Sequence, residues 1–298
     1  MIDALRAVAH RWSDPEYAVR KAAVAKMLEL DAPFTEEAVT FAINQAMYRL
    51  GEDVAHIAPD SGGRIAIQTD ERIPMARFRD AVFALVAGDR IQLINPDPLE
   101  VAFWTEVNAA ASSACVMFEA DQPTRWVKRQ ADPESDAIRL RYGVAVVGER
   151  EAADVWEGLA EDMLLHEGFG EANVRVLFAP ESSTPDTLLD QLAQMRGVLG
   201  AHPSTPSRLK MPQAFLAASK TPHGYGEGLE FLVSRGKAEV QEPAHIRWVP
   251  YTSLDEVRTW LRTHRADVIH IVSTLPLGLP TIEPGTAHRQ PLLARAEA

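Results

Sequence analysis

The sequence predicts an α/β fold with two parallel-sheet lobes that follow an N-terminal helical lead-in. Two observations predict this fold class. Short apolar runs alternate with amphipathic segments in β-α-β order, which is the pattern of a parallel sheet. The chain also has 298 residues, 46% of them apolar, which is enough for two domains or for one α/β domain with additions.

Residues 1–54 are predicted to form the helical lead-in. Leu5, Val8, Ala9 and Trp12 share one helix face, and "SDPEY" from Ser13 is a break that leads into a second helix. Apolar residues recur at helical spacing between Phe34 and Leu50, so a further helix is expected there.

Residues 55–140 are predicted to form the first lobe. We interpret residues 58–74 as a loop rich in turn formers, with Pro74 at the start of a helix that Gly88 ends. The strand "RIQLI", a helix after Pro98 and the strand "ACVMFEA" follow in that order.

Residues 141–274 form the second predicted lobe, and residues 275–298 form a tail. Strands at "YGVAVVG" and "NVRVLFAP" flank a helix that should end at Gly168, giving one βαβ unit. A second unit joins "HIRWVPY" to "DVIHIVST" through a helix opened by the capping box at Ser253 and Glu256. We interpret "HGYGEG", from His223, as a loop. The proline-rich tail either packs on a neighbouring subunit or is a loosely held terminus.

Composition narrows the functional classes. Forty-two acidic against 30 basic residues give a net charge of −12, which argues against nucleic acid and anionic membranes as partners. No apolar run reaches the roughly 18 residues of a membrane span, and no targeting segment is evident, so a cytoplasmic protein is expected. The nine histidines lack ligand spacing, and no metal site is expected. Cys115 is the only cysteine, and its apolar surroundings indicate a core residue.

Several stretches, in order along the chain, resemble bacterial fatty acyl-CoA reductases of the bioluminescence-operon type, a branch of the aldehyde dehydrogenase superfamily. They are "LRAVAHRWSDPEYAVRKAAV", "RFRDAVFALVAGDRIQLINPDPLEVAFWTEV", "RYGVAVVGEREAADVWEGLAEDM", "GLAEDMLLHEGFGEANVRVLFAP" and the run from Gly228 to Thr274. The resemblance implies an aldehyde-dehydrogenase-like fold with a nucleotide-binding lobe, here reduced, and a catalytic lobe. It also implies NADP or NAD as cofactor and acyl-CoA as substrate.

The residues at the implied site differ from the family pattern. A cysteine nucleophile stands in the family's Gly-Cys-Arg-Asn-Val stretch, whereas this chain has Glu171 in "GEANV". The family's cofactor-binding lysine stretch reads from Gln92 to Asn95 here, with an amide in place of the charge. The glycine-bearing turn near the nicotinamide is replaced by a turn with Glu119, Asp121 and Pro123.

Our leading hypothesis is therefore a shortened, degenerate member of that family, a pseudoenzyme that serves as a binding or assembly partner. It would form a homo-oligomer or a hetero-oligomer with an active paralogue, with no cofactor at all or with NAD(P) as a remnant. One alternative is an active NAD(P)H-dependent acyl-CoA reductase that forms fatty aldehyde without covalent capture. Another is a thioester or ester hydrolase with Glu171 as general base. A surface glutamate without a chemical role is the remaining interpretation of Glu171.

Overall fold

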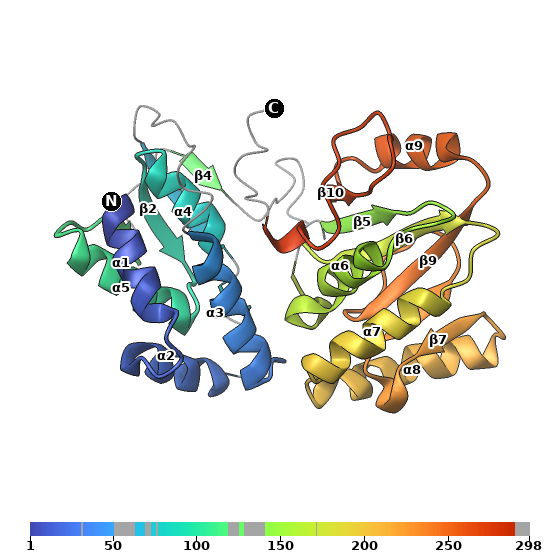
Figure 1. The fold of residues 1–298 in the computed structure, drawn as a ribbon, viewed down its shortest axis with the longest axis horizontal. Helices are drawn as coiled ribbons and strands as arrows, with labels where there is room; N and C mark the ends of the chain where they lie inside the picture. Colours follow the sequence, from blue (N-terminus) through green and yellow to red (C-terminus); the bar gives the residue numbers. More distant parts are fainter. Residues whose placement is uncertain are drawn as a thin grey trace. The chain divides into compact units, whose positions relative to one another are not determined.

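A computed structural model describes residues 1–30, 32–50, 63–68, 73–75, 77–118, 125–127, 141–170 and 172–289 of the chain (Figure 1). These residues form two compact units, the first within residues 1–139 and the second within residues 140–290. Glu171, the predicted turn at 119–124 and the end of the tail from residue 290 lie outside the described residues.

The first unit is a small parallel sheet with helices packed around it. Its sheet has the order β3-β2-β1-β4, and every pairing in it is parallel. The elements, in chain order, are α1 (Ile2–Trp12), α2 (Ala18–Leu28), α3 (Glu36–Leu50), β1 (Arg64–Gln68), α4 (Phe78–Val86), β2 (Arg90–Ile94), α5 (Pro98–Ala110), β3 (Val116–Met117) and β4 (Arg125–Val127). The predicted helical lead-in is confirmed, and the four residues expected on one face of α1 are all buried.

An aromatic cluster fixes α1 to the rest of this unit. Phe103 of α5 is fully buried and meets Trp12 of α1 edge-on, with ring centroids 5.4 Å apart. It also meets Phe78 of α4 at 4.9 Å and Trp104 at 5.0 Å. The indole of Trp12 donates a hydrogen bond of 2.7 Å to Glu106 of α5. The first helix is therefore an integral part of this core.

The second unit is built on a six-stranded sheet of order β10-β5-β6-β9-β8-β7, in which only the edge pairing β7–β8 is antiparallel. Its elements, in chain order, are β5 (Tyr142–Val146), α6 (Ala153–Leu164), η2 (Leu165–Gly168), β6 (Val174–Pro180), α7 (Asp186–Val198), α8 (Ser204–Ala218), β7 (His223–Tyr225), η3 (Glu227–Leu229), β8 (Leu232–Arg235), β9 (His245–Tyr251), α9 (Leu254–Thr263), β10 (Val268–Val272) and η4 (Ala287–Arg289). Both predicted βαβ units are present.

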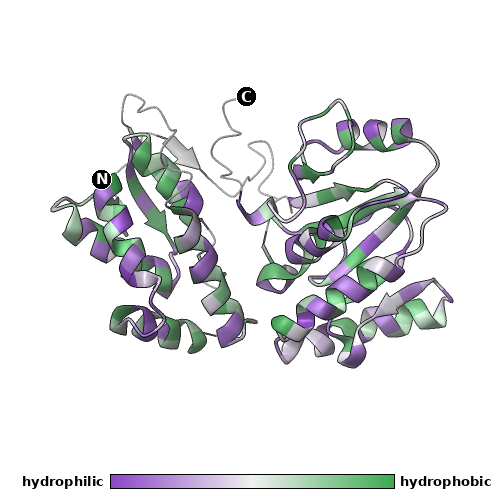
Figure 2. Ribbon diagram, viewed as in Figure 1, coloured by the Kyte–Doolittle hydropathy of each residue, from purple (hydrophilic) through white to green (hydrophobic). Residues whose placement is uncertain are grey.

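Helices cover both faces of this sheet. Apolar residues of α6, α7 and α8 share one core with the sheet, and those of α9 share a second core on its other face. Helices α7 and α9 carry both hydrophobic and hydrophilic residues, as expected for helices that cover a sheet (Figure 2). The Ser253 hydroxyl accepts the predicted capping bond from the backbone of Glu256.

Several local predictions were wrong. Residues 58–74 contain strand β1, and helix α4 begins at Phe78, four residues after Pro74. His223–Tyr225 is an edge strand, not a loop, because its backbone pairs with β8. The described part of the tail packs on the second unit of its own chain, where Leu277 and Ala287 are buried. Packing of the tail on a neighbouring subunit stays a prediction.

We predict that Phe103→Ala lowers the free energy of unfolding by about 3–5 kcal/mol, because it leaves a cavity among three aromatic rings. Chemical denaturation measures this change. Val101→Ala, on the exposed side of the same helix, is the matched control and should cost less than about 1 kcal/mol. Equal effects of the two substitutions would contradict the proposed cluster.

Candidate functional site

The candidate site is the turn between α6 and β6, where the resemblance places the family's nucleophile. Gly170 and Ala172 are described on either side of position 171. Glu171 itself lies outside the described residues, so its predicted catalytic role stays a prediction. The residues around it show how the turn is held.

Three consecutive residues at the start of this turn have left-handed backbone conformations. The φ angles are 53° at His166, 53° at Glu167 and 73° at Gly168. A Cβ atom on residue 168 would lie 2.5 Å from the backbone nitrogen of Ala244, so only glycine fits there. Helix α6 consequently ends at Leu164, earlier than predicted. Non-glycine residues adopt this conformation only where the surroundings enforce it.

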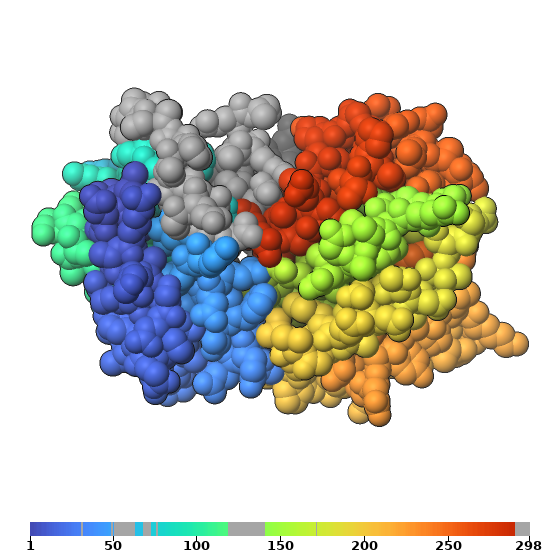
Figure 3. All heavy atoms as spheres, viewed as in Figure 1, coloured from blue at the N-terminus to red at the C-terminus, as the bar shows by residue number. Residues whose placement is uncertain are grey.

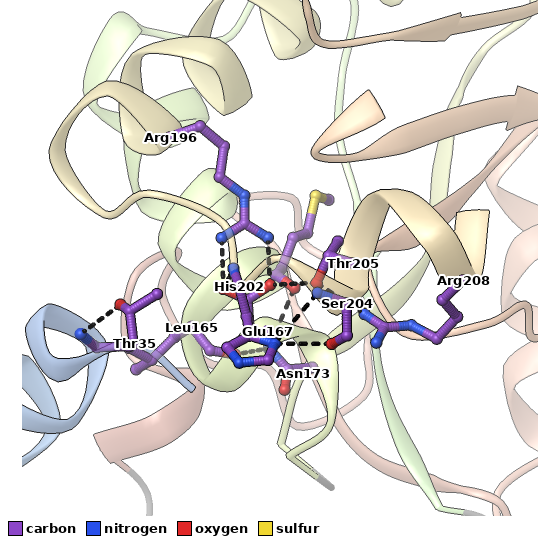
Figure 4. Close-up of polar contacts among 11 residues, drawn as sticks. Thr35, Leu165, Glu167, Asn173, Arg196, His202, Ser204, Thr205 and Arg208 are labelled. Carbon is purple, nitrogen blue, oxygen red and sulfur yellow. Dashed lines mark hydrogen bonds and ion pairs between the residues drawn. The ribbon is translucent and has the colours of Figure 1, made fainter. Parts of the chain in front are cut away.

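A buried carboxylate enforces it. Glu167 and Arg196 of α7 form a bidentate ion pair of 2.8 and 3.0 Å, and each side chain is 2% exposed (Figure 4). The hydroxyl of Thr205 in α8 donates to the same carboxylate at 2.8 Å, and the backbone of His202 donates at 3.3 Å. The charge of Glu167 is thus compensated on all sides, and the turn is joined to α7 and α8.

Asn173 fixes the other end of the turn. Its side-chain nitrogen donates to the carbonyl oxygens of Asp162, Met163 and Leu165 at 3.0, 3.2 and 2.8 Å. The first two carbonyls belong to the last turn of α6 and the third to the residue that follows it, where the helix supplies no further donors. Asn173, which matches the family pattern, therefore has a structural role as a cap.

Two histidines pack beneath Gly170. The ring centroids of His166 and His288 are 5.1 Å apart, and both residues are half-buried. Burial lowers the pKa of His166 to about 4, and burial together with the neighbouring His166 and His270 lowers the pKa of His288 well below its usual value. Both imidazoles are neutral at physiological pH.

The two predicted cofactor residues lie at the end of β2 in the first unit. Gln92 is buried within the strand, and its side-chain oxygen lacks a hydrogen-bond partner. Asn95 is exposed just after the strand, with a φ of 55°. Their cofactor role stays a prediction.

Acidic groups dominate the same strand end. Asp97 caps α5 by accepting from the backbones of Leu99 and Glu100 at 2.7 and 2.9 Å, and also accepts from Met75 at 2.7 Å. Burial raises the pKa of Asp97 to about 7. Burial also raises the pKa of Glu100 well above its usual value, and the charge of the adjacent Asp97 raises it further. The cation Arg77 pairs with Asp80 at 3.2 Å. The described residues here do not fit the phosphates of a dinucleotide, which need free cations or backbone donors.

Sequence reasoning missed these buried groups. The Asp97-Pro98 pair carried a readable signal, because aspartate is a preferred N-cap and proline a preferred first helical residue. Glu167 and the histidine pair had no local sequence signal, since their partners are distant in the sequence.

Within the described ranges, no group of three His, Cys, Asp or Glu side chains could hold a metal ion. Of the described helices, none is long and apolar enough to cross a membrane.

The structure is similar to solved oxidoreductases over nearly its whole length. An oxidoreductase from Marinobacter aquaeolei aligns with a TM-score of 0.59 at 10% identity, over 99% of this chain and 76% of that one. A NAD-dependent benzaldehyde dehydrogenase from Corynebacterium glutamicum gives 0.56 at 13%, over 91% and 75%. An acetylating aldehyde dehydrogenase from Geobacillus thermoglucosidasius gives 0.56 at 10%, over 92% and 76%. No protein-family model matches the sequence, and no curated protein does.

At these identities the similarity shows the fold alone. The predicted fold class, an aldehyde-dehydrogenase-like α/β fold, is confirmed.

We predict that Glu167→Gln costs about 3–5 kcal/mol of unfolding free energy, because it leaves Arg196 buried without its counter-charge. Glu157→Gln, an exposed change on α6, is the control and should be close to neutral. A loss below about 1 kcal/mol for Glu167→Gln would show that the carboxylate does not hold the turn.

Stability should also depend on pH through Glu100. Its pKa is raised in the folded state, so its contribution is complete at acidic pH and is lost as the pH rises through that value. Glu100→Gln should therefore flatten the fall in unfolding free energy as the pH rises above the ordinary carboxyl pKa. Denaturation at several pH values above that pKa measures it, with the exposed Glu37→Gln as control. Parallel curves for wild type and Glu100→Gln would contradict the prediction.

Proposed function

We propose that this protein is a non-catalytic relative of the fatty acyl-CoA reductases that serves as a binding or assembly partner. The proposal combines the aldehyde-dehydrogenase-like fold with the residues that stand at the family's functional positions.

The single observation that carries the proposal is the placement of the only cysteine. Covalent acyl transfer in the resembling family needs a thiolate at the turn before β6. Cys115 belongs instead to the first unit, next to β3, and is 7% exposed. Its thiol donates to the carbonyl oxygen of Ser113 at 3.3 Å. A buried thiol in this environment is an inert core residue, so the chain has no thiol nucleophile for the turn.

Glu171 does not replace that nucleophile. A carboxylate attacks a thioester far less readily than a thiolate, and a mixed anhydride formed on it would be hydrolysed before reduction. The chemistry of a bound nicotinamide would be hydride transfer, and the described groups at the end of β2 do not favour its phosphates. The nucleophile and the cofactor contacts thus both depart from what reduction requires.

Exposed apolar side chains support a role in assembly. Met211 and Phe215 lie one turn apart on α8 and are 80% and 71% exposed, and Tyr225 on β7 is 51% exposed. Large apolar and aromatic residues of this kind are enriched at protein interfaces. We propose that the protein forms a homo-oligomer or a complex with an active paralogue.

The test is a single-turnover assay with long-chain acyl-CoA and NADPH, followed by nicotinamide absorbance, for wild type and Glu171→Cys. We expect no oxidation of NADPH by the wild type, because the thiol nucleophile is missing. Direct calorimetric titration with NADPH and with acyl-CoA, on the same protein, separates loss of binding from loss of chemistry.

Oxidation of NADPH by the wild type would overturn the proposal and support reduction without covalent capture. Thioester hydrolysis without nicotinamide, lost in Glu171→Gln, would instead support a hydrolase with Glu171 as base. Turnover by Glu171→Cys alone would show that the cofactor site is intact and that position 171 blocks the chemistry.

A further inference from the structure

The tail of the second unit lies across helix α6 and is attached to it by several polar contacts. We call residues 282–289 the strap. The backbones of Gly285 and Ala287 donate to the two oxygens of Asp162 at 2.8 and 2.9 Å. Arg289 donates to both oxygens of Glu161 at 3.0 and 3.3 Å. In Figure 3, the red atoms of the tail lie directly on the light-green atoms of α6.

Close contacts define where the strap lies on α6. A Cβ atom on Gly158 would lie 2.7 Å from the backbone nitrogen of Gly285, whose φ of 75° favours glycine in turn. Upstream, Ile282 joins the strap to the sheet, since it donates to Ile271 at 2.9 Å and accepts from Ser273 at 3.0 Å. Two glycines and a paired carboxylate thus set where the strap crosses the helix.

The strap brings His288 against the candidate turn. A Cβ atom on Gly170 would lie 3.3 Å from the Cε1 atom of His288 and 3.7 Å from the Cδ2 atom of His166. The strap therefore covers the residue that precedes position 171. Because the two imidazoles come from different elements, protonation of both would place like charges about 5.1 Å apart in a half-buried space.

We propose that the strap is a proton-operated latch, which leaves α6 when His166 and His288 take up protons and so uncovers the turn at Gly170. This regulation goes beyond the proposed function and does not depend on it.

The direction in which pH changes the release of the strap follows from the titratable groups that face each other across this contact. Both histidines have lowered pKa values when docked, so release lets them take up protons as the pH falls below about 6.5. Asp162 acts in the opposite sense, because burial raises its pKa to about 7 and release lets it lose a proton between about pH 7 and 4. The ion pair between Glu161 and Arg289 and the nearby His270 of β10 also lie beside this contact.

On release, His166 and His288 each gain a proton and Asp162 loses one. The net uptake of one proton favours release of the strap at acidic pH. The docking equilibrium should be nearly constant above pH 7 and should weaken by about tenfold in total between pH 7 and 5, because the slope approaches tenfold per pH unit only once both released histidines are protonated, below about pH 5.5.

Hydrogen exchange of the full-length protein tests the latch. The amides of Gly285 and Ala287, corrected for intrinsic exchange, should lose protection about tenfold in total between pH 7 and 5. The amides of β6 report global unfolding and should keep their protection over the same range. Unchanged protection of the strap between pH 7 and 5 would overturn the proposal, and so would loss of strap and β6 protection together.

Two variants make the test specific. In His288→Phe, His166 is the remaining histidine of the pair. The proton that it gains on release is offset by the proton that Asp162 loses, so the pH dependence of strap exchange should vanish. His166→Asn should do the same with less risk to folding, because asparagine tolerates the left-handed backbone at that position. His10→Phe, at an exposed histidine of α1, is the control and should keep the wild-type profile. A wild-type profile in either of the first two variants would contradict the latch.

Discussion

The buried carboxylate of Glu167 is the constraint on which the second unit depends. An ionised group with 2% of its side chain exposed must be matched by donors, and here these come from α7, α8 and the backbone between them. Matching it requires a left-handed backbone at Glu167, which reverses the chain directly after α6. The reversal places Asn173 under the end of α6 and starts β6 at the centre of the sheet. One ion pair thus determines how three helices and a strand meet at the candidate site.

The elements that could be predicted from sequence are those with local signals. Short continuous apolar runs between amphipathic segments identified β5 and β6. The spacing of Ser253 and Glu256 identified the start of α9, because a cap forms within one helical turn. Helix α8 had no such signal, since Pro212 lies inside it and only three of its residues are buried. Strand β1 was hidden among turn formers. The Glu167–Arg196 pair spans 29 residues, and its existence depends on packing that no local pattern encodes.

At the candidate turn, the residues with a structural role differ from the position where the resembling family has its chemical role. Asn173 and Val174 match the resembling family's pattern, and both have structural work here: the first caps α6, and the second is fully buried at the start of β6. Position 171, which differs, is the one where the family's chemistry would occur. The described supports of this turn therefore come from residues other than position 171. From the sequence, only the resemblance pointed to this turn. The contacts of Glu167 and Asn173 that hold it are seen only in the structure.

The two sides of this turn are held by different means, and the difference matters for how the strap could act. On one side, Glu167 is bound by Arg196 and Thr205, which belong to α7 and α8 and make no use of residues 282–289. On the other side, neutral histidines pack between the turn and the strap. Detaching the strap therefore removes the histidine contact but leaves the ion pair and the Asn173 cap in place. The turn would keep its backbone conformation while its outer face became accessible, which is the condition for a local opening instead of unfolding.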